Sequence, residues 1–222
     1  MAKPALLFDL DGTMLNSDSI HMAVFADMMG SRGLNVTEDF YMQHVHGRLN
    51  VDFFAEFLPN EPDPQGLSDA KEAEFRARLP RPYPAMPGVA EVIAHAVDND
   101  WPRAVVTNAM RLNAEAMLEA VGQRHAFEVM VIGEECPRGK PAPDPYLEAM
   151  RQLGVSPADC IAFEDSPSGT RAAAASGAFT VGIRSALSDR ELRENGAHIT
   201  IQDFNDPALR EVFQRFDREA NT

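Results

Sequence analysis

The sequence predicts an α/β protein with a mainly parallel, three-layer sheet of the Rossmann-like type and a helical domain inserted near its start. Apolar runs with the composition of strands alternate with segments of helical periodicity over most of the 222 residues. This alternation is typical of parallel sheets that are covered by helices on both faces. It is interrupted once, between Ser17 and Pro84, where no strand-like run occurs. The alternation predicts the core sheet, and the interruption predicts the inserted domain.

Six short apolar runs have the composition of buried strands. In chain order they are Ala5–Asp9, Arg103–Thr107, Val129–Gly133, Cys160–Glu164, Phe179–Ile183 and His198–Ile201. Because helical segments separate most of these runs, we expect the strands to lie parallel in one sheet.

Four helical segments are expected between these strands. They are Pro87–Asn99, Arg111–Val121, Asp144–Leu153 and Pro167–Ser176. The first opens with Pro-Gly and carries apolar residues at helical spacing. Each of the other three is followed directly by a glycine, which is a common signal for the end of a helix.

The span without strands is expected to form a separate helical domain. Its four predicted helices are Ser19–Met29, Glu38–Val45, Asn50–Leu58 and Ser68–Leu79. Four prolines between residues 80 and 87 indicate a stiff, extended linker after them. We therefore predict a core domain of residues 1–16 and 85–222 and an inserted domain of residues 17–84. The alternative is that these helices pack on one face of a single domain.

The composition limits the classes of partner. A net charge of −14 disfavours general binding to nucleic acid or to anionic membranes. It does not exclude a phosphorylated substrate, because a metal ion and a nearby lysine can offset the charge. Cys136 and Cys160 lack metal-ligand spacing and are expected to be reduced thiols. With no signal peptide and no bilayer-length apolar run, a cytoplasmic location is expected.

Polar side chains gather where predicted strands end. Asp9, Thr107 and Glu164 are the last residues of the first, second and fourth predicted strands, and Asp11, Asn108 and Asp165 follow them closely. Ligands bind at this edge in open α/β sheets. A carboxylate there can act as a nucleophile, and a second one can carry a proton. Taken alone, each segment also fits a structural role, such as an acidic turn or a helix cap with Ser166 before Pro167.

Lys140 completes the set of candidate polar groups. It lies in Gly139–Asp144, among turn residues, and is one of only three lysines in the chain. A lone lysine is usually a solvated surface group. The order of the four segments nevertheless favours a functional role for this one.

In this order, the four segments resemble the motifs of the haloacid dehalogenase superfamily of phosphotransferases, from Leu6 to about Gly182. The similarity is closest to the branch with a helical cap, which contains β-phosphoglucomutase and phosphoglycolate phosphatase. The resemblance implies that the inserted domain is this cap. It also implies that Asp9 is the nucleophile, forming an aspartyl-phosphate. Asp11 would protonate the leaving oxygen and then deprotonate the attacking water.

The resemblance further implies a Mg²⁺ cofactor. Asp165, an oxygen of Asp9 and the backbone carbonyl of Asp11 are the expected ligands, and Glu164 would lie next to the metal or act through water. Lys140 would reach the phosphoryl oxygens and Asp9. The remaining two core residues, Thr107 and Asn108, would donate hydrogen bonds to the phosphoryl group.

Two residues of the inserted domain are candidates for substrate binding. His21 occupies a position where the mutase-like members also carry histidine, although a lone helical histidine is often structural. Gly47–Asn50 resembles the specificity loop of the cap. Its Arg48 is either a ligand for a substrate phosphate or carboxylate, or a surface arginine. Asn50 stands where the mutase-like members carry arginine, which weakens the transfer of their substrate.

The expected function is a Mg²⁺-dependent phosphatase of a small phosphorylated metabolite, such as a sugar, polyol or glycolate phosphate. The main alternative is a phosphomutase of the β-phosphoglucomutase type. A dehalogenase needs neither a second aspartate nor a metal, so the presence of Asp11 and Asp165 argues against that reaction. A phosphonatase needs a cap lysine near the specificity loop, and the one cap lysine, Lys71, is far from that loop in sequence. A binding protein without turnover ranks last. We expect no nucleic-acid or membrane partner, and a monomer or weak homodimer.

Overall fold

The computed structural model describes residues 3–45 and 48–220, with side chains up to residue 217. The chain divides into two compact units. The core unit consists of the residues up to Asn16 together with those from Arg81 onward, and the helical unit consists of Ser17–Pro80. Among the described residues, no helix has both the length and the apolar composition needed to cross a membrane.

The core unit is built on a six-stranded sheet in which all strands are parallel, in the order β3-β2-β1-β4-β5-β6. The strands are β1 (Ala5–Phe8), β2 (Arg103–Thr107), β3 (Val129–Ile132), β4 (Cys160–Glu164), β5 (Phe179–Ile183) and β6 (Ile199–Ile201). All six predicted strands are thus confirmed, and no boundary differs by more than one residue.

Six helices accompany the sheet: α5 (Val89–Asp98), α6 (Arg111–Ala120), α7 (Asp144–Leu153), α8 (Pro167–Ala175), α9 (Asp189–Glu194) and α10 (Ala208–Ala220). Three short 3₁₀ turns lie between elements: η1 (Arg124–Ala126), η2 (Gly133–Glu135) and η3 (Pro157–Asp159). The four expected core helices are confirmed. Ser166 caps α8 as expected, since its hydroxyl accepts a hydrogen bond from the Gly169 N–H at 3.0 Å.

Helices α9 and α10 were not predicted, although local signals for both exist. At the start of α9, the Ser188 hydroxyl accepts from the Glu191 N–H and the Glu191 carboxylate accepts from the Ser188 N–H, which is a capping box. In α10, Leu209, Val212 and Phe216 are buried at helical spacing. The short length of α9 and the polar composition of α10 concealed these patterns.

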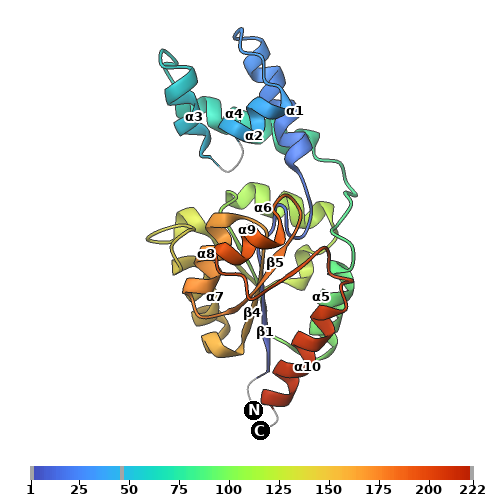
Figure 1. The fold of residues 1–222 in the computed structure, drawn as a ribbon. Coiled ribbons are helices and arrows are strands. Elements are labelled where there is room, and N and C mark those ends of the chain that lie inside the picture. The colour runs from blue at the N-terminus through green and yellow to red at the C-terminus, as the bar shows by residue number, and fades with distance from the viewer. Residues whose placement is uncertain (1–2, 46–47, 221–222) are drawn as a thin grey trace. The chain divides into compact units, whose positions relative to one another are not determined.

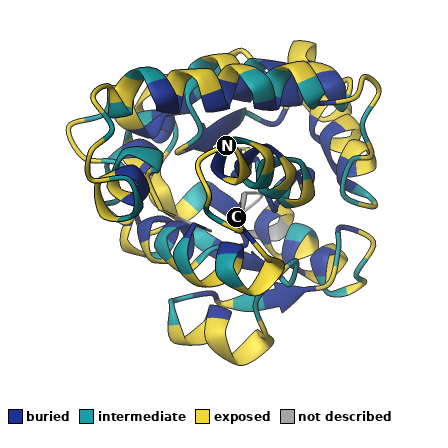
Figure 2. Cartoon of the chain, turned by 90° about the horizontal axis from the view of Figure 1, so that it is seen from above, coloured by how far each residue is buried: buried dark blue, intermediate teal, exposed yellow. Residues whose placement is uncertain are grey.

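The sheet buries both faces, and successive residues of a strand contribute to opposite sides. One cluster contains Leu7 with alanines of α7 and α8, and the other face carries Phe8, stacked on Phe163 with ring centroids 4.9 Å apart. In Figure 1, α7 and α8 lie on one side of the strands, and α5 and α10 lie on the other. Helices carry buried residues along one side and exposed residues along the other (Figure 2). This packing holds the strand ends in a defined position.

The helical unit contains α1 (Asp18–Gly30), α2 (Glu38–His44), α3 (Asn50–Phe57) and α4 (Pro64–Arg78), and its described residues include no strand. Its own core is rich in aromatic side chains, among them Phe25, Phe53 and Phe54. Helix α4 begins four residues before the predicted Ser68. The reason is the local sequence, because the Asp63 carboxylate accepts from the Gly66 N–H and Pro64 occupies the first turn.

A substitution in the central strand tests this description of the core. Leu7 is fully buried in β1, whereas Leu112 on α6 is 59% exposed. Leu7→Ala is expected to lower the free energy of unfolding by about 2–5 kcal/mol, because it leaves a cavity. Leu112→Ala should change it by no more than about 0.5 kcal/mol. Urea unfolding followed by circular dichroism measures both, and similar losses in the two variants would contradict the packing.

Candidate active site

The candidate residues meet at the carboxyl edge of the sheet, where its strand order reverses. The chain passes from β1 to β2 and β3 on one side of β1, and then continues with β4 on the other side. Phe8 of β1 lies opposite Phe163 of β4. Asp9 and Glu164 are the next residues along the chain and therefore lie side by side. The Asp9 N–H donates to the Phe163 carbonyl at 3.0 Å. Such a reversal is where ligands bind in open α/β sheets.

The buried ammonium of Lys140 connects the strand ends. Its Nζ donates to Asp9 Oδ1 at 2.6 Å, to Glu164 Oε1 at 2.6 Å and to the Val106 carbonyl at 2.7 Å. An ammonium has three hydrogens, so all its donors are used. The Lys140 side chain is only 3% exposed. The surface role that composition alone favoured is therefore wrong for this lysine.

Asn108, at the end of β2, holds the backbone of this lysine. Its Oδ1 accepts from the Lys140 N–H at 3.2 Å, and its Nδ2 donates to the Lys140 carbonyl at 3.3 Å. Thr107 is buried beside it, and its hydroxyl accepts from the Ala109 N–H at 3.0 Å. Asn108 thus fixes the loop that carries Lys140, and Thr107 fixes the turn after β2. Hydrogen bonding from either residue to a phosphoryl group stays a prediction.

Three carboxylates form a compact acidic group near the lysine. Asp9, Glu164 and Asp165 each offer an oxygen within 4.8 Å of the other two. Asp165 is held by two hydroxyls, with Thr13 Oγ1 donating to Oδ1 at 3.3 Å and Ser185 Oγ donating to Oδ2 at 3.0 Å. The group is composed of oxygen donors only, which suits Mg²⁺ better than softer metals.

The charges in this group are not balanced by the protein. Burial raises the pKa of Asp9 to about 7, and the charges of Glu164 and Asp11 act in the same direction, against the effect of Lys140. Burial also raises the pKa of Asp165 well above its usual range, with repulsion from Asp9 and Glu164 adding to it. One ammonium binds two of the three buried carboxylates, Asp9 and Glu164, and a second cation would therefore stabilise the ionised forms of the group.

Asp11 lies in the turn that follows β1 and is half-buried. Its charge contributes to the raised pKa values of both Asp9 and Asp165, so it is close to the acidic group. Its side chain is not among the three whose oxygens lie within 4.8 Å of one another. Asp11 is therefore near the acidic group but is not one of the three residues that form it.

Two glycines make room for the acidic side chains. Gly12 has φ +84°, and a Cβ at this position would overlap the Asp165 carboxylate. A Cβ at Gly169, in the first turn of α8, would overlap the Glu164 carboxylate. Tyr146 also reaches the site, where its hydroxyl donates to Glu164 Oε1 at 2.8 Å. Nothing in the spacing of residues identified these glycines, Tyr146 or Ser185 as neighbours of the site.

The two remaining candidates lie in the helical unit. Arg48 Nη2 donates to Glu56 Oε2 at 2.9 Å, and its side chain is about one-third exposed (34%). His21 stacks on Phe75 with ring centroids 3.9 Å apart, and its Nδ1 is 2.6 Å from Nζ of the buried Lys71. Gly47, the first residue of the expected specificity loop, lies outside the described residues. Substrate binding by His21 and Arg48 stays a prediction.

Lys71 was considered in the sequence only as a Schiff-base lysine, and the structure gives it a defined environment. Its Nζ donates to Glu72 Oε1 at 2.8 Å, and this oxygen also accepts from Asn50 Nδ2 at 2.7 Å. Burial opposes the ionisation of Glu72, but Lys71 outweighs it and lowers the pKa of Glu72. The ammonium is therefore engaged in a buried ion pair within the helical unit.

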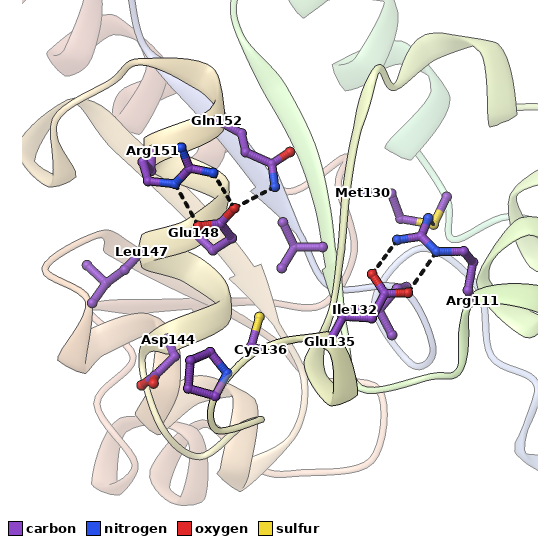
Figure 3. A pocket seen from close by; sticks show the side chains of 12 residues that line it. Arg111, Met130, Ile132, Glu135, Cys136, Asp144, Leu147, Glu148, Arg151 and Gln152 are labelled. Atoms are coloured by element: carbon purple, nitrogen blue, oxygen red, sulfur yellow. Dashed lines mark hydrogen bonds and ion pairs between the residues drawn. The ribbon is translucent and has the colours of Figure 1, made fainter.

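A pocket of about 720 Å³ in the core unit is separate from the acidic group. It lies beside β3 and is lined in part by α7 (Figure 3). Its two arginines are occupied by ion pairs, Arg111 with Glu135 at 2.6 Å and Arg151 with Glu148 at 2.7 Å. Because none of the candidate core residues lines this pocket, the edge of the sheet is the better candidate for catalysis.

Comparison with known proteins identifies a family and several relatives. The family model described as haloacid dehalogenase-like hydrolase matches residues 6–183. The chain is 34% identical over 194 residues to protein CbbY from Rhodobacter capsulatus, covering 80% of this chain and 83% of that protein. It is 31% identical over 186 residues to fructose-1-phosphate phosphatase YqaB from Escherichia coli strain K12, covering 81% of this chain and 95% of that protein.

A solved structure supports the same relationship. The HAD hydrolase of family IA, variant 3, from Entamoeba histolytica has a TM-score of 0.85 to this chain at 26% identity. The match covers 96% of this chain and 99% of that chain.

The contact between Gly12 and Asp165 gives a testable prediction. Gly12→Ala is expected to lower the free energy of unfolding by about 1–2 kcal/mol because of the left-handed backbone. It should cost about 1–3 kcal/mol more because Asp165 must move. Gly122→Ala is the matched control, since Gly122 has φ +69° and open space around it. Equal losses in urea unfolding would contradict the close approach of Asp165.

Proposed function

The chain belongs to the haloacid dehalogenase-like hydrolases, and we propose that it is a Mg²⁺-dependent phosphatase acting through an aspartyl-phosphate on Asp9. The observation that carries this proposal is the group of three buried carboxylates at the carboxyl edge of the sheet, two of which bind the ammonium of Lys140. Phosphoryl transfer needs an aligned nucleophile and neutralisation of charge. In this arrangement, Asp9 is the proposed nucleophile, and Lys140 together with a bound cation would neutralise charge.

Asp9 and Asp11 divide the chemistry between them in this proposal. The Asp9 carboxylate attacks phosphorus, so that an O–P bond forms and the bond to the substrate oxygen breaks. Asp11 gives its proton to that leaving oxygen. It then takes a proton from a water molecule, which attacks phosphorus and releases inorganic phosphate, leaving Asp9 free again. The position of Asp11 beside, but outside, the compact acidic group supports this division.

Lys140 keeps the nucleophile oriented and stabilises charge. Its hydrogen bond of 2.6 Å to Oδ1 holds one Asp9 oxygen, so that the other is the one proposed to attack. In the transition state, the same ammonium would interact with the phosphoryl oxygens. Thr107 and Asn108 are proposed to donate to these oxygens as well.

Mg²⁺ is proposed to bind between Asp9, Asp165, Glu164 and the backbone carbonyl of Asp11. The oxygen-only donor set and the excess of negative charge both fit this ion. When bound, it would neutralise charge on the phosphoryl group and on the carboxylates.

The substrate is proposed to be a small phosphorylated metabolite such as a sugar, polyol or glycolate phosphate. One relative, 31% identical, is named a fructose-1-phosphate phosphatase, which supports the sugar phosphates in this set. We propose that the helical unit acts as the cap domain and that His21 and Arg48 contact the part of the substrate beyond its phosphate. A cytoplasmic location and a monomer or weak homodimer remain predictions.

A panel of sugar, polyol and glycolate phosphates tests the activity. We expect phosphate release with Mg²⁺ and none with EDTA, because the acidic group then lacks its second cation. Asp9→Asn should reduce kcat below detection with the fold intact, whereas Asp98→Asn on α5, an exposed control with the same charge change, should keep it. Activity of Asp9→Asn would rule out this nucleophile. Phosphoryl migration on hexose 1-phosphates without release would instead indicate the mutase.

The two roles of Asp11 can be separated by the choice of leaving group. Asp11→Asn is expected to lower kcat for an alkyl phosphate by about 10²–10⁴-fold, because neither proton transfer is assisted. For p-nitrophenyl phosphate the leaving group needs no proton, so that only the second step is slow. Rapid-quench kinetics should then show a burst of p-nitrophenol that matches the enzyme concentration. A variant with wild-type rates on both substrates would refute the proton-transfer role.

A further inference from the structure

The orientation of Lys140 depends on Glu164, whose side chain is completely buried. Glu164 Oε2 accepts weakly from the N–H groups of Asp165 and Ser166, at 3.2 and 3.4 Å, and from the Ser166 hydroxyl at 3.3 Å. Its other oxygen, Oε1, accepts from Lys140 Nζ at 2.6 Å and from the Tyr146 hydroxyl at 2.8 Å. The two shortest contacts of this carboxylate are thus made by Lys140 and Tyr146.

Tyr146 approaches the site from within the core. It lies in the first turn of α7, is fully buried, and its ring packs in the cluster that contains Ala149 and Met150. Lys140 Nζ lies 5.2 Å from the centre of this ring. A buried phenol hydroxyl is costly unless it has a hydrogen-bond partner, and here that partner is Glu164. The ring therefore packs in the hydrophobic core, whereas the hydroxyl binds a carboxylate of the candidate site.

We propose that Tyr146 is a positioning residue that holds Lys140 on Asp9 by fixing the Glu164 carboxylate. Lys140 is shared between two carboxylate oxygens at the same distance of 2.6 Å. Without the Tyr146 hydroxyl, Glu164 Oε1 has Lys140 as its remaining hydrogen-bond donor and attracts it more strongly. The ammonium then moves toward Glu164, and its hydrogen bond to Asp9 weakens.

The consequence for catalysis rests on the proposed phosphatase function, whereas the position of Lys140 can be measured without it. Tyr146→Phe removes one oxygen atom and keeps the ring beneath the ammonium. Ser176→Ala is the matched control, since it removes a buried hydroxyl that donates to the Ala173 carbonyl at 2.6 Å. Ser176 lies at the end of α8 away from Ser166 and is no part of the proposed site.

The first measurement is the ¹H–¹⁵N spectrum of the side-chain ammonium groups in metal-free protein labelled with ¹⁵N-lysine. Lys3, Lys71 and Lys140 are the only lysines in the chain, and Lys71 and Lys140 are buried. Their ammonium hydrogens should exchange slowly with water, and Lys140→Arg identifies the Lys140 signal. Lys71, in the helical unit, serves as an internal reference within every spectrum.

In Tyr146→Phe we expect the Lys140 signal to shift and its exchange with water to accelerate about three- to tenfold, the effect of losing one hydrogen bond. The Lys71 signal should not change, and Ser176→Ala should alter neither. An unchanged Lys140 signal in Tyr146→Phe would overturn the proposal. So would a Tyr146→Phe protein that does not fold while Ser176→Ala does, because the hydroxyl would then support the fold itself.

The second measurement is steady-state kinetics on a substrate found with the panel. Tyr146→Phe should lower kcat about three- to tenfold with KM changed less than about twofold, because Lys140 acts mainly in the transition state. A rise in KM alone would overturn the positioning role. If the wild type hydrolyses no phosphate ester, the proposed function fails, and the lysine spectra still decide whether Tyr146 positions Lys140.

Discussion

The buried ammonium of Lys140 is the interaction on which the site depends. Three segments that are distant in sequence supply its acceptors, namely Asp9 after β1, Val106 in β2 and Glu164 at the end of β4. Burying Lys140 would be unfavourable if any of these acceptors were missing, because a buried cation must be paired and hydrogen-bonded. The lysine therefore requires the order and register of these three strands to be as they are.

The fold meets this requirement mainly through its backbone. The backbone pairing of β1 with β4 is enough to place Asp9 beside Glu164. The turn between β4 and α8 then supplies the N–H groups of Asp165 and Ser166 to Glu164, and Gly169 leaves the space that its carboxylate occupies. Helices and strands of the core unit hold the site on a rigid support, which is the condition for preorganised charge stabilisation.

The sequence was sufficient to predict the strands, all helices except α9 and α10, and the positions of the polar residues, because these leave local signals. Apolar runs indicated the strands and glycines indicated the helix ends. The candidate core residues other than Lys140 lay at strand ends or directly after them. Contacts between distant segments left no such signal. Three features depend on packing across the sheet: the burial of Lys140, the contact of Tyr146 with Glu164, and the space that Gly12 leaves for Asp165. The capping box of α9 was a local signal that was missed.

The imbalance of charge explains why a lysine alone does not complete this site. Lys140 is already bound to Asp9, Glu164 and a carbonyl, so its single positive charge is shared between two of the carboxylates. Burial raises the pKa of Asp9 to about 7, so the carboxylate would be partly protonated at neutral pH, and a protonated carboxyl is a poor nucleophile. A cation held by Asp165 and Asp9 would favour the ionised forms of both. In the proposed mechanism, binding of Mg²⁺ and ionisation of Asp9 would then be one coupled event, and the same buried acidic group would account for both.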